Sequence, residues 1–459
     1  MTICRALLLL IALASFWAQE STNVRVTVRE RKTGLPVPAR VYLTDGKGAF
    51  LAPPGAITYE KYLERHFVSR GSFELRLTPG IYRLIAERGP EYRPSSSEID
   101  LKPDERRDET LSLERWIDMN ALGWYSGDLH NHRKPDEMPD LLLAEALNLA
   151  PTLTDWIWEE RSISRPPSAS KAIREVDPKH VFSVLDKEVE RLESGPGAVA
   201  LVGLRSVIPF DGYRLHPPND AYTRLARAQG GYVDAEKILW RDVAALVALE
   251  QIDFAGIVHN HFNRHTVELE TERWGMIPKH RPEFNTIAGM PLWSMDVYYR
   301  FLNCGFRLAV SAGSASGVKA APLGYNRVYV KMTEPFGYAA WLQALKAGRS
   351  FATNGPMLFF TVNGQEPGAQ LAKSRPDSAK LRIRAEALSA GPLERLEIIH
   401  NGRVLRKITA GPDSGRLLAD FELSASEGGW LAARCFEQPG TTVKFAHTSP
   451  VYLQERIQG

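Results

Sequence analysis

Two short histidine motifs carry the residue types and spacing that most clearly suggest chemistry in this chain. They are His130-Asn131-His132 and His259-Asn260-His261, and each follows an apolar run typical of a buried strand. Chance predicts roughly 0.26 His-x-His pairs for 11 histidines in 459 residues, so composition alone does not explain two. Side chains two apart on a strand point to the same side, so each motif can aim two imidazoles at one point. Two such pairs at one rim would form a transition-metal site.

The elements that must position these histidines lie between residues 116 and 356, where strand-like and helix-like patterns alternate. Such alternation is the signature of a parallel α/β architecture. The expected strands are residues 122–129, 152–155, 181–185, 198–204, 253–258, 306–311 and 327–331. The expected helices are residues 138–150, 221–229, 235–250, 295–303 and 338–347. Seven such units predict a closed barrel, whose chemistry lies at the carboxyl ends of the strands, where both histidine motifs fall.

The two flanking regions, residues 23–115 and 357–459, have the pattern of β-sandwich domains. Short runs with period-two alternation occur in both, separated by turn residues. In the C-terminal region they are residues 359–362, 381–384, 396–399 and 442–445, with hairpin signals at Asn363-Gly364 and Asn401-Gly402. The sequence therefore predicts a multidomain protein, a central α/β barrel between N- and C-terminal β-sandwiches.

Residues 1–19 have the composition of a removable secretory signal peptide. Arg5 precedes a short apolar stretch, and Ala18-Gln19 lies near a plausible cleavage point, although Phe16 replaces a small residue. The stretch is too short to span a bilayer. We therefore expect a periplasmic or secreted protein with no transmembrane segment in its mature form.

Charge and cysteine content exclude several classes of protein. The chain has 57 Lys and Arg against 54 Asp and Glu, interspersed, which argues against a nucleic-acid or polybasic membrane partner. Beyond the signal only Cys304 and Cys435 remain, so a disulfide scaffold is excluded. The expected partner is a small-molecule or carbohydrate-like substrate.

The residues around the first motif, Gly127-Asp128-Leu129-His130-Asn131-His132, resemble the first metal motif of the PHP superfamily (polymerase and histidinol phosphatase). More narrowly, the chain is similar to the CehA/McbA branch of carbaryl-hydrolase-like metallohydrolases. The similarity extends to residues 345–356 and 446–452. This resemblance implies a distorted (β/α)7 barrel and one to three divalent metals.

Carried over position by position, the resemblance assigns His130 and His132 to the first motif and His261 to a later one. His259 is either a second ligand there or an ordinary rim histidine. The carboxylate ligand expected on a later strand is Glu188, with Glu190 as the alternative register and a surface salt bridge as the alternative role.

The chain also departs from the family pattern. Thr154-Asp155-Trp156 stands where the superfamily has Thr-Asp-His, and residues 313–317 lack the Asp and His of Gly-Ser-Asp-x-His. The remaining donors suit one divalent ion with an open position for water, and Zn²⁺, Mn²⁺ or Fe²⁺ would tolerate them.

The expected function is that of an exported metal-dependent hydrolase of ester, carbamate or phosphoester bonds that uses a metal-bound water. Glu188 or Asp155 could accept the proton of that water. Basic side chains could stabilise an oxyanion or bind an anionic substrate, although a solvated helix face or a structural pairing explains each better. They are Arg133, Lys134, Lys237 and Arg349.

The alternative is a non-catalytic ligand- or carbohydrate-binding protein on a degenerate PHP-like barrel. The missing ligands favour it, whereas the repeated histidine motif favours the enzyme. Trp156 could wall a pocket or pack in the core, and His447 is expected to satisfy a buried hydrogen bond.

Overall fold

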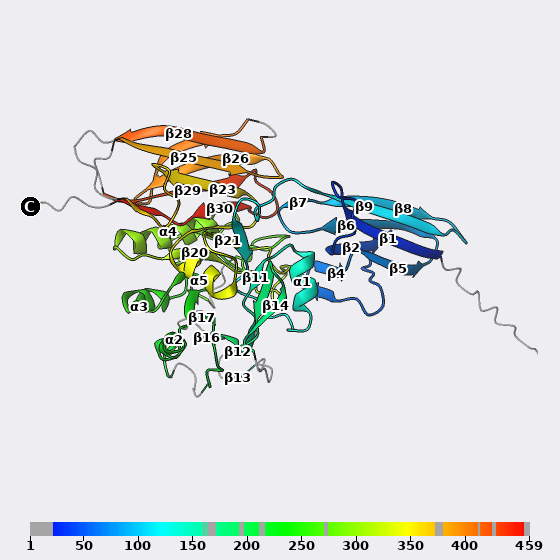
Figure 1. The fold of residues 1–459 in the computed structure, drawn as a ribbon, viewed down its shortest axis with the longest axis horizontal. Helices are drawn as coiled ribbons and strands as arrows, with labels where there is room; N and C mark the ends of the chain where they lie inside the picture. The colour runs from blue at the N-terminus through cyan, green and yellow to red at the C-terminus, as the bar shows by residue number, and fades with distance from the viewer. Residues whose placement is uncertain are drawn as a thin grey trace, which may run out of the picture.

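The structure is a computed structural model that describes most of the chain (Figure 1). The described residues are 22–158, 161–162, 171–191, 197–210, 216–269, 274–371, 380–411, 414–424 and 428–453. The expected signal peptide at residues 1–19 lies outside them. No described helix has both the length and the apolar character needed to cross a membrane.

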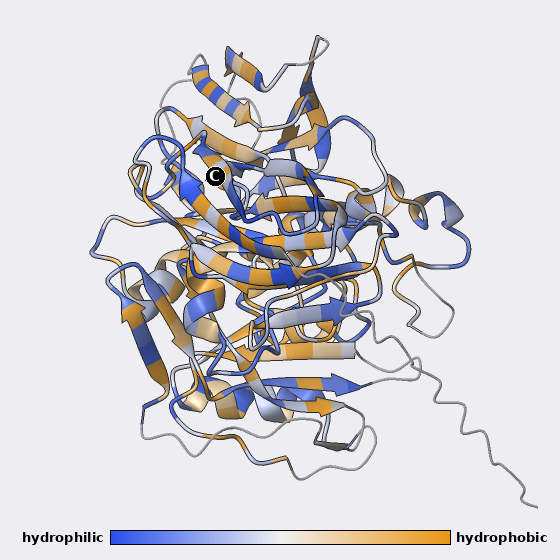
Figure 2. Ribbon diagram, turned by 90° about the vertical axis from the view of Figure 1, so that its right-hand side faces the viewer, coloured by the Kyte–Doolittle hydropathy of each residue, from blue (hydrophilic) through white to orange (hydrophobic). Residues whose placement is uncertain are grey.

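The N-terminal region is a sandwich-like pair of sheets that share one apolar core. Val24, Val26 and Val28 alternate inward along the first strand, as a half-buried strand requires (Figure 2 shows such alternation along many strands). One sheet has the order β5-β1-β9-β7 and the other β3-β4-β2-β6-β8. The bounds are β1 (Thr22–Glu30), β2 (Ala39–Asp45), β3 (Thr58–Lys61), β4 (Glu64–Ser69), β5 (Ser72–Leu77), β6 (Gly80–Glu87), β7 (Tyr92–Arg93), β8 (Ser95–Leu101) and β9 (Arg107–Arg115).

The central region contains a mixed seven-stranded sheet of order β13-β12-β16-β17-β18-β19-β20. Neighbours β16–β17 and β17–β18 are antiparallel, whereas β18–β19 and β19–β20 are parallel. Most of these strands are buried on both faces. The bounds are β12 (Leu153–Trp158), β13 (Arg161–Ser162), β16 (Asp186–Arg191), β17 (Gly197–Val202), β18 (Tyr232–Ala235), β19 (Phe254–Val258) and β20 (Ala309–Ala312).

A second, twelve-stranded sheet runs from the central region into the C-terminal region without interruption. Its main path is β14-β15-β11-β10-β21-β22-β30-β29-β26-β27, and β24 and β31 pair beside it. The bounds are β10 (Trp124–Gly127), β11 (Leu149–Ala150), β14 (Ile173–Asp177), β15 (His180–Ser183), β21 (Arg327–Lys331), β22 (Ser350–Thr353), β24 (Gln370–Leu371), β26 (Leu393–His400), β27 (Arg403–Thr409), β29 (Gly429–Glu437), β30 (Phe445–Thr448) and β31 (Val451–Leu453).

A three-stranded sheet, β23-β25-β28, shares an apolar core with the C-terminal half of this long sheet. Its bounds are β23 (Met357–Val362), β25 (Lys380–Leu388) and β28 (Arg416–Ser424). Asn401 and Gly402 both have positive φ (48° and 85°) and form the predicted hairpin turn between β26 and β27. The turn at Asn363-Gly364 closes only an isolated bridge between Val362 and Gln365.

The helices are few and short. Within the described residues they are α1 (Met138–Ala144), α2 (Asn219–Ala228), α3 (Val243–Ala248), α4 (Gly289–Asn303), α5 (Tyr338–Lys346) and the 3-10 turn η1 (Pro282–Phe284). The helix expected over residues 138–150 is shorter because its last two residues form β11. The one expected over residues 235–250 shrinks to α3, and Ala235 ends a strand instead.

The prediction of a (β/α)7 barrel is wrong. All seven expected strand positions carry strands, but the described residues are mostly β and antiparallel pairs such as β16–β17 and β21–β22 interrupt the expected alternation. An antiparallel pair can be joined by a short turn, whereas a parallel pair needs a crossover that is usually helical. The apolar pattern of the sequence does not mark β16 and β18 as strands, and without them the neighbouring strands read as parallel strands joined by helices.

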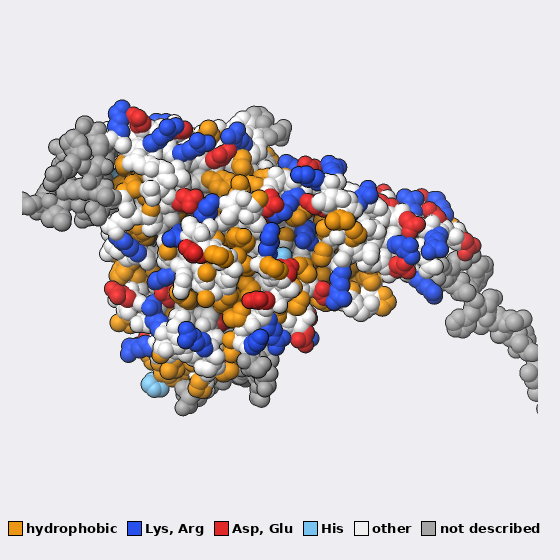
Figure 3. Space-filling view, viewed as in Figure 1, with side chains coloured by type: hydrophobic (Ala, Val, Ile, Leu, Met, Phe, Trp, Pro, Cys, Tyr) orange, Lys and Arg blue, Asp and Glu red, His pale blue; other side chains and the backbone are white. Residues whose placement is uncertain are grey.

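The charged surface agrees with the composition. Figure 3 shows Lys and Arg side chains interspersed with Asp and Glu over the visible face.

The N-terminal sheets lie beside the central region, where β4 contacts α1 and Val68 joins an apolar cluster with residues of that helix (Figure 1).

Candidate metal centre

The first histidine motif lies in an extended segment between two other segments of the central region. The backbone N–H of His132 donates to the carbonyl of Ser316 (2.7 Å), and Asn131 forms a parallel bridge with Ser316. On the other side, the N–H of Leu153 donates to the carbonyl of Asn131 (2.9 Å). These bonds keep the segment extended beyond the end of β10, so His130 and His132 project to the same side.

Asp128 fixes the start of this segment. Its carboxylate accepts backbone N–H groups from His130 (3.1 Å), Ser314 (3.0 Å) and Gly324 (2.7 Å). Burial raises the pKa of Asp128, and these hydrogen bonds oppose the rise. The carboxylate thereby ties the histidine segment to the loop after β20.

The two imidazoles and Glu188 converge. The Nε2 atoms of His130 and His132 are 3.1 Å apart, and Oε2 of Glu188 lies 3.4 Å from the first and 2.9 Å from the second. Each of the three residues offers one ligand atom, and these three atoms all lie within 4.8 Å of one another. Ligand atoms about 2.0–2.1 Å from a tetrahedral Zn²⁺ lie roughly 3.3 Å apart, so these spacings fit one ion.

A buried polar atom in this group also fits a cation. Within the described part of the chain, Oε2 of Glu188 has no partner with hydrogen-bond geometry. Burial alone would raise the pKa of Glu188, but the charge of His130 and the contacts with His130 and His132 together more than offset burial and lower it. A buried carboxylate of this kind requires a positive partner.

A further carboxylate orients His130. Oε2 of Glu236 lies 2.5 Å from Nδ1 of His130, an ion-pair contact without hydrogen-bond geometry, while its Oε1 accepts hydrogen bonds from Lys237 Nζ (2.5 Å) and Trp240 Nε1 (2.9 Å). Burial would lower the pKa of His130, but Glu236 and Glu188 more than offset it and raise that pKa to about 10. A carboxylate on Nδ1 leaves Nε2 as the lone-pair atom, which is the usual arrangement of a metal-bound histidine.

The three candidate ligands line a cavity of about 210 Å³. Its walls combine aromatic, basic and amide side chains with the loop after β20. Besides the ligands, the lining residues are Trp156, Glu190, Lys237, Trp240, Asn260, His261, Trp274, Ala315, Val318 and Lys319. Burial, Glu188 and Glu236 raise the pKa of Glu190 to about 8.

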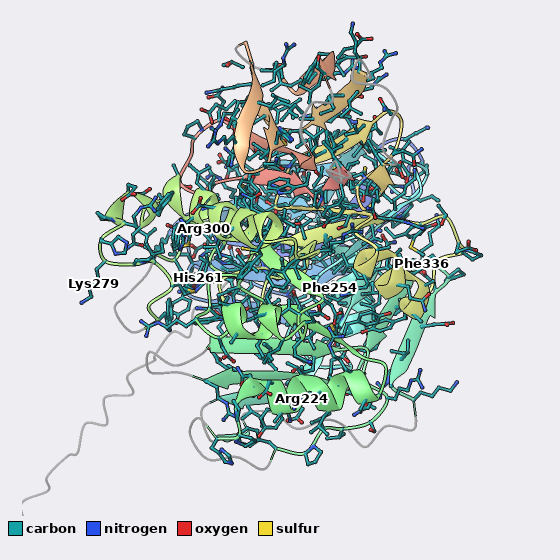
Figure 4. All side chains as sticks on the ribbon, turned by 90° about the vertical axis from the view of Figure 1, so that its left-hand side faces the viewer. Arg224, Phe254, His261, Lys279, Arg300 and Phe336 are labelled. Carbon is teal, nitrogen blue, oxygen red and sulfur yellow. The ribbon has the colours of Figure 1, made fainter. Side chains whose placement is uncertain are left out.

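The second histidine motif does not repeat the arrangement of the first. His261 lines the cavity, but among the described residues it lies outside the group of three ligand atoms. Its Nδ1 is 2.8 Å from the carbonyl of Glu268, so Nδ1 must be the donor and Nε2 keeps the lone pair. Burial lowers the pKa of His261 well below its ordinary value, so the ring is neutral. Figure 4 labels His261 and Phe254, and Phe254 is the first residue of β19 (Phe254–Val258), which His261 follows in sequence.

His259 has other partners. Its Nε2 is 3.2 Å from Oγ of Ser294, and its Nδ1 accepts the backbone N–H of His261 (3.4 Å). The ring packs on Phe262 with 4.5 Å between centroids. The structure thus places His259 in packed surroundings that do not line the cavity.

The other predicted site residues separate into two groups. Lys237 lines the cavity, whereas Asp155 forms an ion pair with Lys187 and contributes no lining atom. Arg133 pairs with Glu137 (2.8 Å), and Arg349 donates to Thr333 Oγ1 (2.8 Å); the structure does not bring either to the cavity. Lys134 is exposed.

Sequence reasoning missed Glu236, and the reason is local. The segment that carries it was assigned to the start of a helix, although Gly230-Gly231 and the run Tyr232-Val233-Asp234-Ala235 are a turn and a strand signal. As the residue after β18, Glu236 lies at a strand end beside the first histidine motif. Lys319, Asn260 and Trp274 had no comparable signal.

Comparisons with known proteins do not name a family. No model of a known protein family matches the chain, and no curated protein matches it. Among solved structures, the Bacillus anthracis TIE protein aligns with 24% of this chain at 8% identity and a TM-score of 0.17, and the chain covers 19% of its length. A pilus-presented adhesin, Spy0125 (Cpa), aligns with 21% of this chain and 27% of its own at 15% identity and a TM-score of 0.10. Such low TM-scores carry no information on function.

Proposed function

We propose that this protein is a metal-dependent hydrolase of ester, carbamate or phosphoester bonds, with one Zn²⁺, Mn²⁺ or Fe²⁺ held by His130, His132 and Glu188. The observation that carries the proposal is the convergence of these three ligand atoms within 4.8 Å inside a cavity. Three protein ligands leave coordination positions for water and substrate, as in catalytic rather than structural sites. His261 lies outside the group, so we assign its neutral imidazole to the wall that faces the substrate.

The electrostatics of the cavity support a cation. Glu188 and Glu236 are buried and Glu190 is half-buried, and Lys237 and Lys319 are basic side chains that line the same space. A bound ion would polarise the scissile carbonyl or phosphoryl group and lower the pKa of a water molecule toward ~7. Glu236 orients His130 through the 2.5 Å contact, and Lys237 in turn holds Glu236.

The remaining cavity residues have separable tasks. Glu190 lies two residues after Glu188 on β16, so both carboxylates face the same side, and Glu190 is placed to accept or return a proton. Asp155 is committed to Lys187 and is not available for this task. Lys237 and Lys319 are placed to bind an anionic substrate group, and the tryptophans exclude water.

A second candidate function is ligand binding without turnover, with a carbohydrate as the ligand. The observation that favours it is the presence of Trp156, Trp240 and Trp274 around one cavity, because aromatic faces stack on sugar rings. Under this proposal the metal would help to bind sugar hydroxyls. Turnover separates the two functions.

The experiment is metal analysis of the purified protein followed by substrate screening. We expect about one equivalent of transition metal per chain, lost when His130 and His132 are both replaced by alanine. His180→Ala is the matched control, because this histidine also contacts a carboxylate (Asp177, 2.8 Å) but does not line the cavity. Absence of metal after reconstitution would remove the basis of both functions.

Screening p-nitrophenyl esters, carbamates and phosphates with and without chelator then separates enzyme from binding protein. We expect chelator-sensitive hydrolysis that the double histidine variant loses. Metal binding without turnover on any of these substrates, together with sugar binding, would favour the second function.

We also propose that the motif at residues 127–132 is related to the first metal motif of the PHP superfamily, in its CehA/McbA branch, and that the protein is exported. The supporting observations are the His-x-His string and the signal-like residues 1–19. Amino-terminal sequencing of protein recovered from the periplasm or medium tests the export.

A further inference from the structure

A hydroxyl group of the N-terminal sheets is hydrogen-bonded to a loop that lines the cavity. Tyr59, on β3, is 6% exposed, and its hydroxyl accepts the backbone N–H of Gly317 (2.9 Å) and donates to the carbonyl of Lys319 (2.5 Å). The two bonded residues lie about 260 positions away in sequence, in the loop after β20. Burial raises the pKa of Tyr59 to about 12, so the hydroxyl keeps the proton that it donates.

This loop, residues 315–319, lies directly against the candidate ligands. The N–H of Ala315 donates to the carbonyl of His130 (2.6 Å), and the N–H of His132 donates to the carbonyl of Ser316 (2.7 Å). Gly317 has φ of +103°, and a Cβ there would lie 2.9 Å from the carbonyl carbon and oxygen of His132. A change in the position of the loop must therefore move one or both imidazoles.

The loop also forms one wall of the cavity. Ala315, Val318 and Lys319 line it, and Lys319 Nζ reaches Glu268 Oε2 (2.5 Å). The carbonyl of Glu268 in turn accepts from His261 (2.8 Å). One loop thus connects both histidine motifs.

From these contacts we infer that Tyr59 is a positioning residue for the metal site: its hydroxyl fixes the loop of residues 315–319, and through it the orientation of His132 and the place of Lys319. The inference rests on the metal site proposed above. It gives the N-terminal sheets a part in the site itself, which no residue pattern in those sheets indicated.

The N-terminal sheets also contact the segment between His261 and Glu268, which faces the loop of residues 315–319. Glu87 of β6 pairs with Arg264 (2.5 Å), and Glu64 of β4 contacts His265 (2.9 Å). These residues follow His261 and precede Glu268. The N-terminal sheets therefore contact both the loop of residues 315–319 and the segment of residues 261–268. These two segments are joined by the ion pair between Lys319 and Glu268.

The test is Tyr59→Phe, which keeps the ring and removes both hydrogen bonds. We expect about a tenfold weaker Zn²⁺ affinity, as for other groups that orient metal ligands, and an altered absorption spectrum of the Co²⁺-substituted protein. Tyr82→Phe is the matched control, because Tyr82 is equally buried in these sheets and, among the described residues, its hydroxyl bonds only to Thr78 (2.8 Å to the carbonyl). The control should leave both readouts unchanged.

Gly317→Ala perturbs the same loop from its opposite side and should change the Co²⁺ spectrum in the same way. If Tyr59→Phe and Gly317→Ala both keep wild-type Zn²⁺ affinity and Co²⁺ spectrum while Glu188→Gln loses metal, the positioning role is refuted and the metal site stands. If the wild-type protein binds no Zn²⁺ or Co²⁺, both fail.

Discussion

The contact between Glu236 and His130 can be tested by Glu236→Gln, a change of nearly constant shape. In the structure Nδ1 of His130 lies 2.5 Å from Oε2 of Glu236, an ion-pair distance at which the negative charge favours a proton on Nδ1 and leaves Nε2 for the metal. A glutamine can place its NH₂ group there, which cannot accept that proton and favours the opposite tautomer. Its carbonyl can still accept from Lys237 and Trp240, which bond the other oxygen.

The size of the effect follows from what the substitution removes. Loss of a carboxylate that orients a metal-bound histidine costs roughly ten- to a hundredfold in metal affinity, or about 1.4 kcal/mol per tenfold. We expect a decrease in this range for Zn²⁺, measured by competition with a chromophoric chelator at pH 7.5. The stability of the metal-free protein should change less, because the two hydrogen bonds to the remaining oxygen persist.

Glu190→Gln is the control for general loss of negative charge in the cavity. Glu190 lines the same space but makes its hydrogen bond with Trp156 Nε1 (3.3 Å) rather than with a candidate ligand. We expect its metal affinity to stay within about threefold of wild type, since it orients no ligand. Equal losses of Zn²⁺ affinity in Glu236→Gln and Glu190→Gln, or no loss in Glu236→Gln, would refute the role of Glu236 in orienting His130.

Three further outcomes are expected. Burial lowers the pKa of His447 from 6.5 to about 3, so the stability that its neutral form contributes is lost as pH falls below 6.5. Between pH 7 and pH 5 we therefore expect the free energy of unfolding of the wild type to fall by about 2 kcal/mol relative to that of His447→Phe, as measured by chemical denaturation. A difference between the two proteins that stays constant over this pH range would contradict the expectation. Gly127→Ala should lower the unfolding free energy by about 1–3 kcal/mol, because the added Cβ would lie 2.5 Å from the ring of Trp341; an unchanged melting curve would be the contrary result. Asp155→Ala should lower the free energy of unfolding by about 3–5 kcal/mol, because it leaves Lys187 buried without its partner, and the variant should still bind the metal. Loss of metal binding in a folded variant would instead show that Asp155 belongs to the metal site.

The difference between the two histidine motifs shows what spacing alone can predict. Both follow a strand, and period-two alternation applies to the first because Asn131 is bridged to Ser316 and stays extended. After β19 the chain turns, with the N–H of Phe262 donating to the carbonyl of His259 (2.9 Å), so the alternation ends. Nothing in the triplets themselves distinguishes these outcomes, because the partner that keeps the first one extended lies almost two hundred residues away.

The acidic residues of the site were difficult to predict for a different reason. Apolar runs revealed the seven expected strands, but β16 reads Asp186-Lys187-Glu188-Val189-Glu190-Arg191, which has the composition of a solvated surface. Its charges are buried because they face one another, the imidazoles and the ion pairs of neighbouring strands. The family resemblance, and not the residue pattern, points to Glu188, and the pattern does not predict the strand β16 that carries it. The barrel prediction failed at the same place.

The long sheet that passes from β22 into β30 has a consequence for truncation. The boundary expected between the central and C-terminal regions, at residues 356 and 357, falls between strands that remain hydrogen-bonded to one another. A chain cut there would lose β30, one of the two neighbours of β22, and expose the backbone of Phe351, Ala352 and Thr353, all buried in the intact protein. Open apolar edges of this kind recruit strands from other molecules, so the shortened protein should self-associate rather than survive as an independent catalytic fragment.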